Sequence, residues 1–130
     1  MYVTGLMNAV MQSPDWSSTA IFLAWDDWGG FYDHVSPLQV DEFGLGLRVP
    51  RMVIGPYVKE NYIDQRTYSS ESWLRITEKR FGIAPMTLRD TQAADMLDAF
   101  SFTQKPRPPL ILAATNQGST YPQPLQLIER

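Results

Sequence analysis

Apolar residues near the start of the chain recur with the spacing of a helix. They follow the order i, i+3, i+4, i+7 and i+8 that lies along one helix face, at Val3, Leu6, Met7, Val10 and Met11. Because the residue before a proline disfavours helical backbone angles, we expect this helix to end before Pro14.

Two segments predict strands, of which the first is a continuous apolar run and the second is largely apolar. The first covers residues 19–25 and ends at Asp26-Asp27, and the second covers residues 49–54 and ends at Gly55-Pro56. A run without alternation is typical of a strand whose two faces are both covered by helices. We therefore expect two buried strands.

A second helix is predicted from Ser69 or Ser70, either of which can cap its start, to about Arg80. Gly82 is placed to end it, since glycine readily adopts the left-handed conformation that closes a helix. A short third helix is predicted over residues 91–100.

The order helix, strand, loop, strand, helix indicates an α/β fold with a parallel pair of strands flanked by helices. Two buried strands form an incomplete sheet, because its edges and faces need cover. We expect another stretch of polypeptide or a second copy of the chain to complete it. The predicted domain covers residues 1–103, and residues 104–130, which hold five of the ten prolines, form an extended Pro-rich tail.

Composition limits the classes of function. A chain of 130 residues with 44% hydrophobic and 19% charged residues is typical of one globular domain. A net charge of −3 without a basic run argues against a nucleic-acid partner. The absence of cysteine excludes disulfides and thiolate metal sites. No apolar run is long enough to cross a bilayer, and no signal peptide follows Met1, so the localisation stays undetermined.

The most informative chemistry follows the first predicted strand. Neighbouring side chains on a strand point to opposite faces, so Asp26 and Asp27 can reach one ion only if the backbone turns there. Gly29-Gly30 makes such a turn inexpensive. Ligands of open α/β sheets bind at the carboxyl ends of strands, and carboxylates suit hard divalent cations. A divalent metal site is one interpretation, and a solvated turn is the other.

His34 is the chain's single histidine, and Asp33 precedes it. Asp33 could orient the imidazole by a hydrogen bond, or it could cap a turn. A lone histidine is also often exposed or purely structural, so both interpretations stay open.

Residues 25–35, Trp-Asp-Asp-Trp-Gly-Gly-Phe-Tyr-Asp-His-Val, resemble a signature of the phosphoesterase family, which includes bacterial phospholipases C and acid phosphatases. That family belongs to the alkaline-phosphatase-like superfamily. The likeness extends over residues 2 to 109 through motifs that follow in order, at residues 44–50, 53–57, 72–75, 80–82, 89–90 and 98–100.

The resemblance implies a C-terminal part of an alkaline-phosphatase-like fold and metal-dependent hydrolysis of a phosphate ester or phospholipid. It implies that Asp26 and Asp27 hold a divalent metal ion of unknown identity. Asp33 and His34 would be candidate catalytic residues that support these ligands without binding the metal themselves. The family's nucleophile and remaining ligands come from segments upstream of those matched here. We therefore expect this chain alone to bind metal weakly and to turn over substrate slowly or not at all. Relatives are often exported.

The competing hypothesis is a non-catalytic module. Unpaired sheet edges could drive self-association, and residues 105–109, Lys-Pro-Arg-Pro-Pro, could adopt the polyproline II form that groove-binding domains recognise. For that tail, the interpretation that we favour is either a simple wrap against the domain surface or a disordered end.

Overall fold

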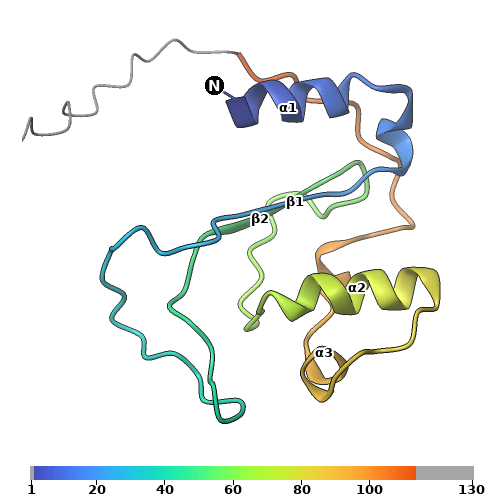
Figure 1. Cartoon of the computed structure of the whole chain (residues 1–130). Helices are drawn as coiled ribbons and strands as arrows, with labels where there is room; N and C mark the ends of the chain where they lie inside the picture. The colour runs from blue at the N-terminus through green and yellow to red at the C-terminus, as the bar shows by residue number, and fades with distance from the viewer. Residues whose placement is uncertain (1, 114–130) are drawn as a thin grey trace, which may run out of the picture.

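The computed structural model describes residues 2–113. Figure 1 shows α1 on one side of a short pair of strands and α2 with α3 on the other. No helix in this part of the chain is long and apolar enough to cross a membrane. In chain order, the elements are α1 (Tyr2–Met11), a 3₁₀ helix (Pro14–Ser18), β1 (Ile21–Ala24), β2 (Arg51–Ile54), α2 (Glu71–Phe81), α3 (Leu88–Gln92) and a second 3₁₀ helix (Leu97–Ala99).

The two strands pair antiparallel, with Ile21 opposite Ile54 and Ala24 opposite Arg51. The mixture of helices and sheet agrees with the predicted class, but the predicted parallel pair is wrong for β1 and β2. A parallel pair needs a crossover, usually a helix, to carry the chain back to the same end. Residues 25–50 contain no helix, so the chain reverses through a long loop and β2 runs back along β1.

The strands are less buried than their apolar sequences predicted. Every residue of β1 is half-buried, and Met52 on β2 is 45% exposed. The buried apolar residues lie outside the strands, at Met11, Trp16, Val58, Met96 and Ala99. The expectation of strands covered on both faces is therefore wrong for residues 2–113.

The helix ends follow local signals. α1 ends at Met11, before Pro14, and α2 ends at Phe81 with Gly82 in the left-handed conformation (φ 66°), both as predicted. The helix predicted over residues 91–100 is wrong. Thr87 and Asp90 form a reciprocal capping box that starts α3 earlier, and positive φ at Met96 separates α3 from the second 3₁₀ helix.

Residues 101–112 lie along the domain and return to α1 (Figure 1, orange). The Arg107 amide donates to the Pro56 carbonyl at 3.0 Å, and the Trp16 indole donates to the Arg107 carbonyl at 3.1 Å. Asn8 then exchanges two hydrogen bonds with the backbone of Leu112, at 2.8 and 2.9 Å. The first ten residues of the predicted tail thus lie against the domain, whereas residues 114–130 fall outside the described part.

Candidate functional site

The acidic pair lies just beyond the carboxyl end of β1. The Trp25 amide donates to the Pro50 carbonyl at 3.4 Å, and this bond prolongs the strand pairing by one residue. Asp26 and Asp27 follow immediately, and both are exposed. The turn after them has positive φ at Gly29 and Gly30 (67° and 77°), the conformation for which the two glycines were expected.

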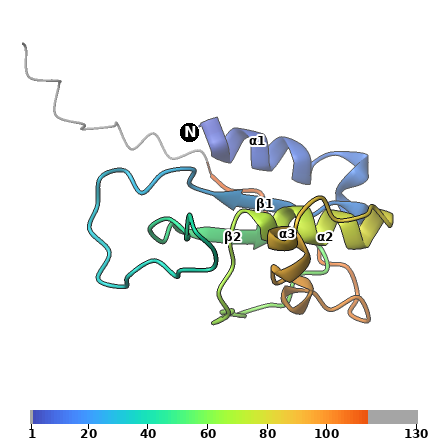
Figure 2. The same ribbon diagram turned by 60° about the horizontal axis from the view of Figure 1, so that its bottom comes forward.

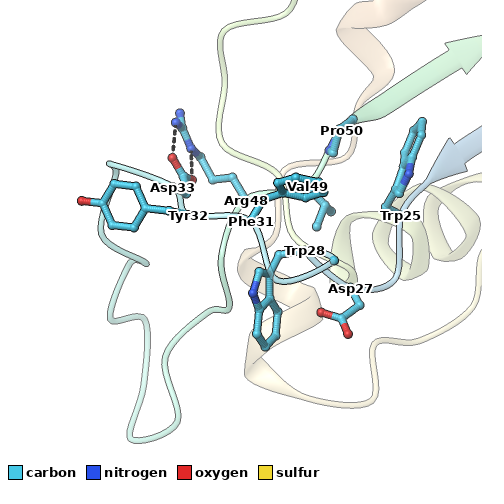
Figure 3. Close-up of a pocket in the computed structure, with 10 residues that line it drawn as sticks. Trp25, Asp27, Trp28, Phe31, Tyr32, Asp33, Arg48, Val49 and Pro50 are labelled. Carbon is cyan, nitrogen blue, oxygen red and sulfur yellow. Dashed lines mark hydrogen bonds and ion pairs between the residues drawn. The ribbon is translucent and has the colours of Figure 1, made fainter. Parts of the chain in front are cut away.

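Asp27 lines a cavity of about 640 Å³ between this turn and the residues that precede β2. Figure 2 shows the loop of residues 25–50 projecting from the body of the molecule, and Figure 3 shows the cavity at its base. In the close-up, Asp27 and Trp28 lie together on one side, and Asp33 and Arg48 lie at the far end. The remaining lining residues are largely aromatic or apolar: Trp25, Gly29, Phe31, Tyr32, Val49 and Pro50.

Asp33 forms a two-point ion pair with Arg48. Arg48 Nε donates to Oδ2 at 2.7 Å and Nη2 donates to Oδ1 at 2.8 Å. The Val35 amide also donates to Oδ1, at 3.2 Å. The guanidinium of Arg48 is the main reason that the pKa of Asp33 lies well below its usual range. Asp33 therefore stays ionised and fastens the 26–35 turn to the residues leading into β2.

His34 projects into solvent, with its side chain 82% exposed. Its Nδ1 atom lies 3.8 Å from Asp33 Oδ1, which is too long for a hydrogen bond. The carboxylate of Asp33 accepts its hydrogen bonds from Arg48 and from the Val35 amide, and none from the imidazole of His34. Asp33 and His34, which are neighbours in the sequence, therefore share no hydrogen bond in this structure.

A second, larger cavity of about 1550 Å³ contains both aspartates of the pair. It extends from the carboxyl end of β1 to the first turn of α2, which contributes Glu71 and Trp73. Its basic lining residues are Arg48, Arg51, Arg66 and Arg89.

Arg89, in α3, ties the long loop to α2. Its guanidinium donates to both carboxylate oxygens of Asp41 at 2.7 Å, to the Gly44 carbonyl at 2.7 Å and to Glu71 at 3.1 Å. This arrangement lowers the pKa of Asp41 to about 2. In the sequence, Arg89 is distinguished only as part of the motif at residues 89–90. No local spacing pairs it with Asp41, which lies 48 positions earlier.

A divalent ion is implied for this site, and the donor chemistry of Asp26 and Asp27 fits it in part. Both carboxylates are exposed, and neither forms an ion pair within residues 2–113. In that range, no three or more His, Asp or Glu side chains gather into a metal-binding group. A hard ion takes about six oxygen ligands. The pair can therefore supply only part of a coordination shell.

The chain is similar in sequence to the phosphoesterase family and to proteins named phospholipase C. The model of the phosphoesterase family matches residues 1–84, which include the acidic pair, Asp33 and His34. A non-hemolytic phospholipase C of Burkholderia pseudomallei is 28% identical over 138 aligned residues, covering 78% of this chain. Phospholipase C A of Mycobacterium tuberculosis is 30% identical over 131 residues, covering 80%. A non-specific phospholipase C6 of Arabidopsis thaliana is 27% identical, covering 81%.

The matched stretch is a small part of each relative. It covers 19% of the Burkholderia protein and 25% of both the Mycobacterium and the Arabidopsis proteins. The chain thus spans about a fifth to a quarter of the length of these relatives.

Proposed function

Because the chain belongs to the phosphoesterase family, we propose that it supplies part of the active site of a hydrolase acting on phosphate esters, with phospholipids as the substrate class. The names of the relatives, all phospholipases C, support this substrate class. In the complete enzyme, β1 and β2 would belong to a larger alkaline-phosphatase-like sheet.

The observation that carries the proposal is the position of Asp26 and Asp27. They lie within the stretch that matches the family, at the carboxyl end of β1, and both open into the same large cavity. Carboxyl ends of strands are where open α/β proteins bind their ligands.

In this proposal, Asp26 and Asp27 hold a divalent metal ion. When bound, such an ion polarises a phosphoryl oxygen and lowers the pKa of a nucleophilic hydroxyl. Asp33 keeps the turn in place through Arg48. His34, exposed at the same turn, can face the substrate without belonging to the metal site.

The chain by itself offers too little for rapid turnover. It supplies two carboxylates, and the serines and threonines that line the larger cavity, Ser36, Thr67, Ser69 and Ser70, lie in no recognisable nucleophile motif. We therefore propose weak metal binding and slow or absent hydrolysis by the isolated chain.

Metal binding can be measured directly by titrating the chain with Mn²⁺ and following the free ion by electron paramagnetic resonance. We expect Asp27→Asn and Asp26→Asn each to weaken binding by about tenfold or more, since losing even an indirect partner of a ligand costs that much. Glu42→Gln is the matched control, because Glu42 is an exposed carboxylate on the same loop. It should leave binding unchanged.

Equal Mn²⁺ affinity in the two aspartate variants and the parent would contradict the assigned site. Hydrolysis of a chromogenic phosphate ester gives the second measurement. Rapid turnover by the chain that disappears in Asp27→Asn would contradict the expectation of slow hydrolysis while supporting the site.

A further inference from the structure

The four arginines of the larger cavity differ in their partners. Three form ion pairs with carboxylates: Arg48 with Asp33, Arg66 with Asp64 and Asp98, and Arg89 with Asp41 and Glu71. Arg51 forms none with any residue in the range 2–113. It is therefore the cavity arginine whose charge no carboxylate of the described chain balances.

Within residues 2–113, the hydrogen bonds and the ring contact of Arg51 are with uncharged groups. Nη1 donates to the Ser69 carbonyl at 3.0 Å and lies 3.8 Å from the sulfur of Met96. The guanidinium carbon lies 4.9 Å from the ring centre of Trp73, so the planar group rests against the indole. These contacts fix the orientation of the guanidinium, and they leave Nε and Nη2 without a hydrogen-bond partner among residues 2–113.

Burial lowers the pKa of Arg51 from its ordinary value, because the surroundings remove water without supplying an anion. The group remains a cation at any physiological pH. A bound anion would offset this loss of solvation.

The strand pairing places Arg51 close to the acidic pair in the fold. Arg51 begins β2 and is paired with Ala24, the last residue of β1, two positions before Asp26. All three residues line the same cavity. A cation at this place suits an anionic ligand, which two bare carboxylates would repel.

We propose that Arg51 binds an oxyanion in this cavity, and that the ligand is the phosphoryl group of the phosphate ester. The assignment rests on the proposed function for the identity of the ester, although binding of the oxyanion itself does not require metal or turnover. A guanidinium matches phosphate well because two parallel N–H donors meet two phosphoryl oxygens. Trp73 and the Ser69 carbonyl hold the guanidinium of Arg51, so its orientation is set before the ligand binds.

The test is calorimetric titration of the full chain with inorganic phosphate in the presence of EDTA at constant ionic strength. We expect saturable binding that Arg51→Met weakens by about tenfold or more, as expected for the loss of a charged hydrogen-bonding partner. The phosphate affinity of Arg51→Lys should lie between those of the parent and Arg51→Met, since lysine keeps the charge but lacks the two parallel N–H donors of a guanidinium. Arg66→Met is the matched control, because Arg66 lines the same cavity but is already paired.

Circular dichroism of each variant reports whether the fold survives. If Arg51→Met loses its helical signal, the comparison of Arg51→Lys with the parent carries the test. Absence of phosphate binding by the parent, equal affinity in the folded Arg51 variants, or an equal loss in Arg66→Met would overturn the proposal.

Because the titration contains EDTA, its outcome is independent of the metal site at Asp26 and Asp27. If phosphate binds but Mn²⁺ does not bind at Asp26 and Asp27, only the proposed function is contradicted. Intact Mn²⁺ binding without phosphate binding would contradict only the assignment of Arg51.

Discussion

At the scale of single residues, ion pairing sorts the four aspartates of the 25–50 loop into two groups. Asp33 and Asp41 are each held by an arginine through two hydrogen bonds. Asp26 and Asp27 have no such partner in the described chain, and both line the larger cavity. The first group fixes the loop, and the second is left available to a ligand.

A buried carboxyl in α2 gives a residue-scale prediction about pH. Glu78 is 6% exposed and lies beside Asp90, which is 1% exposed and accepts hydrogen bonds from Met86 and Thr87. Burial, with Asp90 adding to it, raises the pKa of Glu78, whereas the bonds from Thr87 and Met86 lower the pKa of Asp90. Glu78 thus holds its proton more tightly than an ordinary glutamate, although the Arg75 guanidinium, 3.6 Å away, opposes this rise in pKa, and Asp90 gives up its proton more readily.

The sign of the effect follows from linkage. Below the ordinary pKa of 4.5, Glu78 is protonated in both the folded and unfolded states. As the pH rises through the raised pKa, the unfolded chain gives up this proton more readily, so the folded state loses stability. We expect Glu78→Gln to match the parent at about pH 4 and to be more stable than the parent at about pH 7.

Urea unfolding followed by circular dichroism at both pH values measures this difference. Glu60→Gln is the control, since Glu60 is exposed. It should change the free energy of unfolding little at either pH. A Glu78→Gln variant that is less stable than the parent at about pH 7 would mean that the ionised form of Glu78 stabilises the fold.

Sequence could identify Asp26 and Asp27 as candidates but could not assign partners to the other charges. The strand end and the glycine turn are local features, and both are present as predicted. The partners of Asp33 and Asp41 lie 15 and 48 positions away, so only the folded path of the chain brings them together. The pairing of Asp33 with Arg48, and not with His34, is of this kind.

At the scale of elements, predictions succeeded where the signal was local. Pro14 and Gly82 delimit α1 and α2 through their own backbone preferences. The direction of β2 depends instead on the path of the 25–50 loop, which no local pattern encodes. The burial of the strands likewise depends on what covers them, and residues 2–113 supply little of that cover.

At the scale of elements, alanine substitutions at two glycines should change the stability of the fold in opposite directions. Gly82 ends α2 with φ 66°, where an L-residue is strained, so Gly82→Ala should lower the free energy of unfolding by about 1 kcal/mol. Gly5 lies inside α1, and a methyl group there would meet no atom within 4 Å. Gly5→Ala should therefore raise stability by about 0.5–1 kcal/mol.

Urea unfolding of the two variants and the parent under the same conditions provides the measurement. The pair serves as its own control, because both substitutions add the same methyl group. Equal effects of the two substitutions would show that the left-handed conformation at Gly82 does not limit stability.

At the scale of the whole molecule, the chain leaves much apolar surface uncovered. Large apolar side chains that are at least 45% exposed occur on β2, on the loop and along residues 81–88, at Met52, Phe31, Phe43, Phe81, Met86 and Leu88. Where such side chains gather into one large patch, they mark a surface that contacts other protein. In relatives four to five times longer, further polypeptide is available to cover the corresponding surface.

The unpaired edges of the sheet are one place where further polypeptide could bind. Within residues 2–113 the sheet contains only β1 and β2, so each strand has one edge without a partner strand. A two-stranded sheet is at best marginally stable in water, and unpaired edges recruit further strands. We expect the isolated chain to self-associate through this sheet, which is also how the non-catalytic hypothesis would operate.

Light scattering after size exclusion, across a range of chain concentrations, tests this expectation. We expect a discrete oligomer that dissociates on dilution, and we expect Met52→Lys on β2 to shift the equilibrium towards monomer, since a charge on an exposed strand opposes pairing. Leu74→Lys is the matched control, because Leu74 is similarly exposed on α2, outside the sheet. A strictly monomeric chain with little helical signal would contradict self-association and would mean that folding requires the additional polypeptide found in the longer relatives. A stable oligomer that responds to Met52→Lys but not to Leu74→Lys would locate the interface on the sheet.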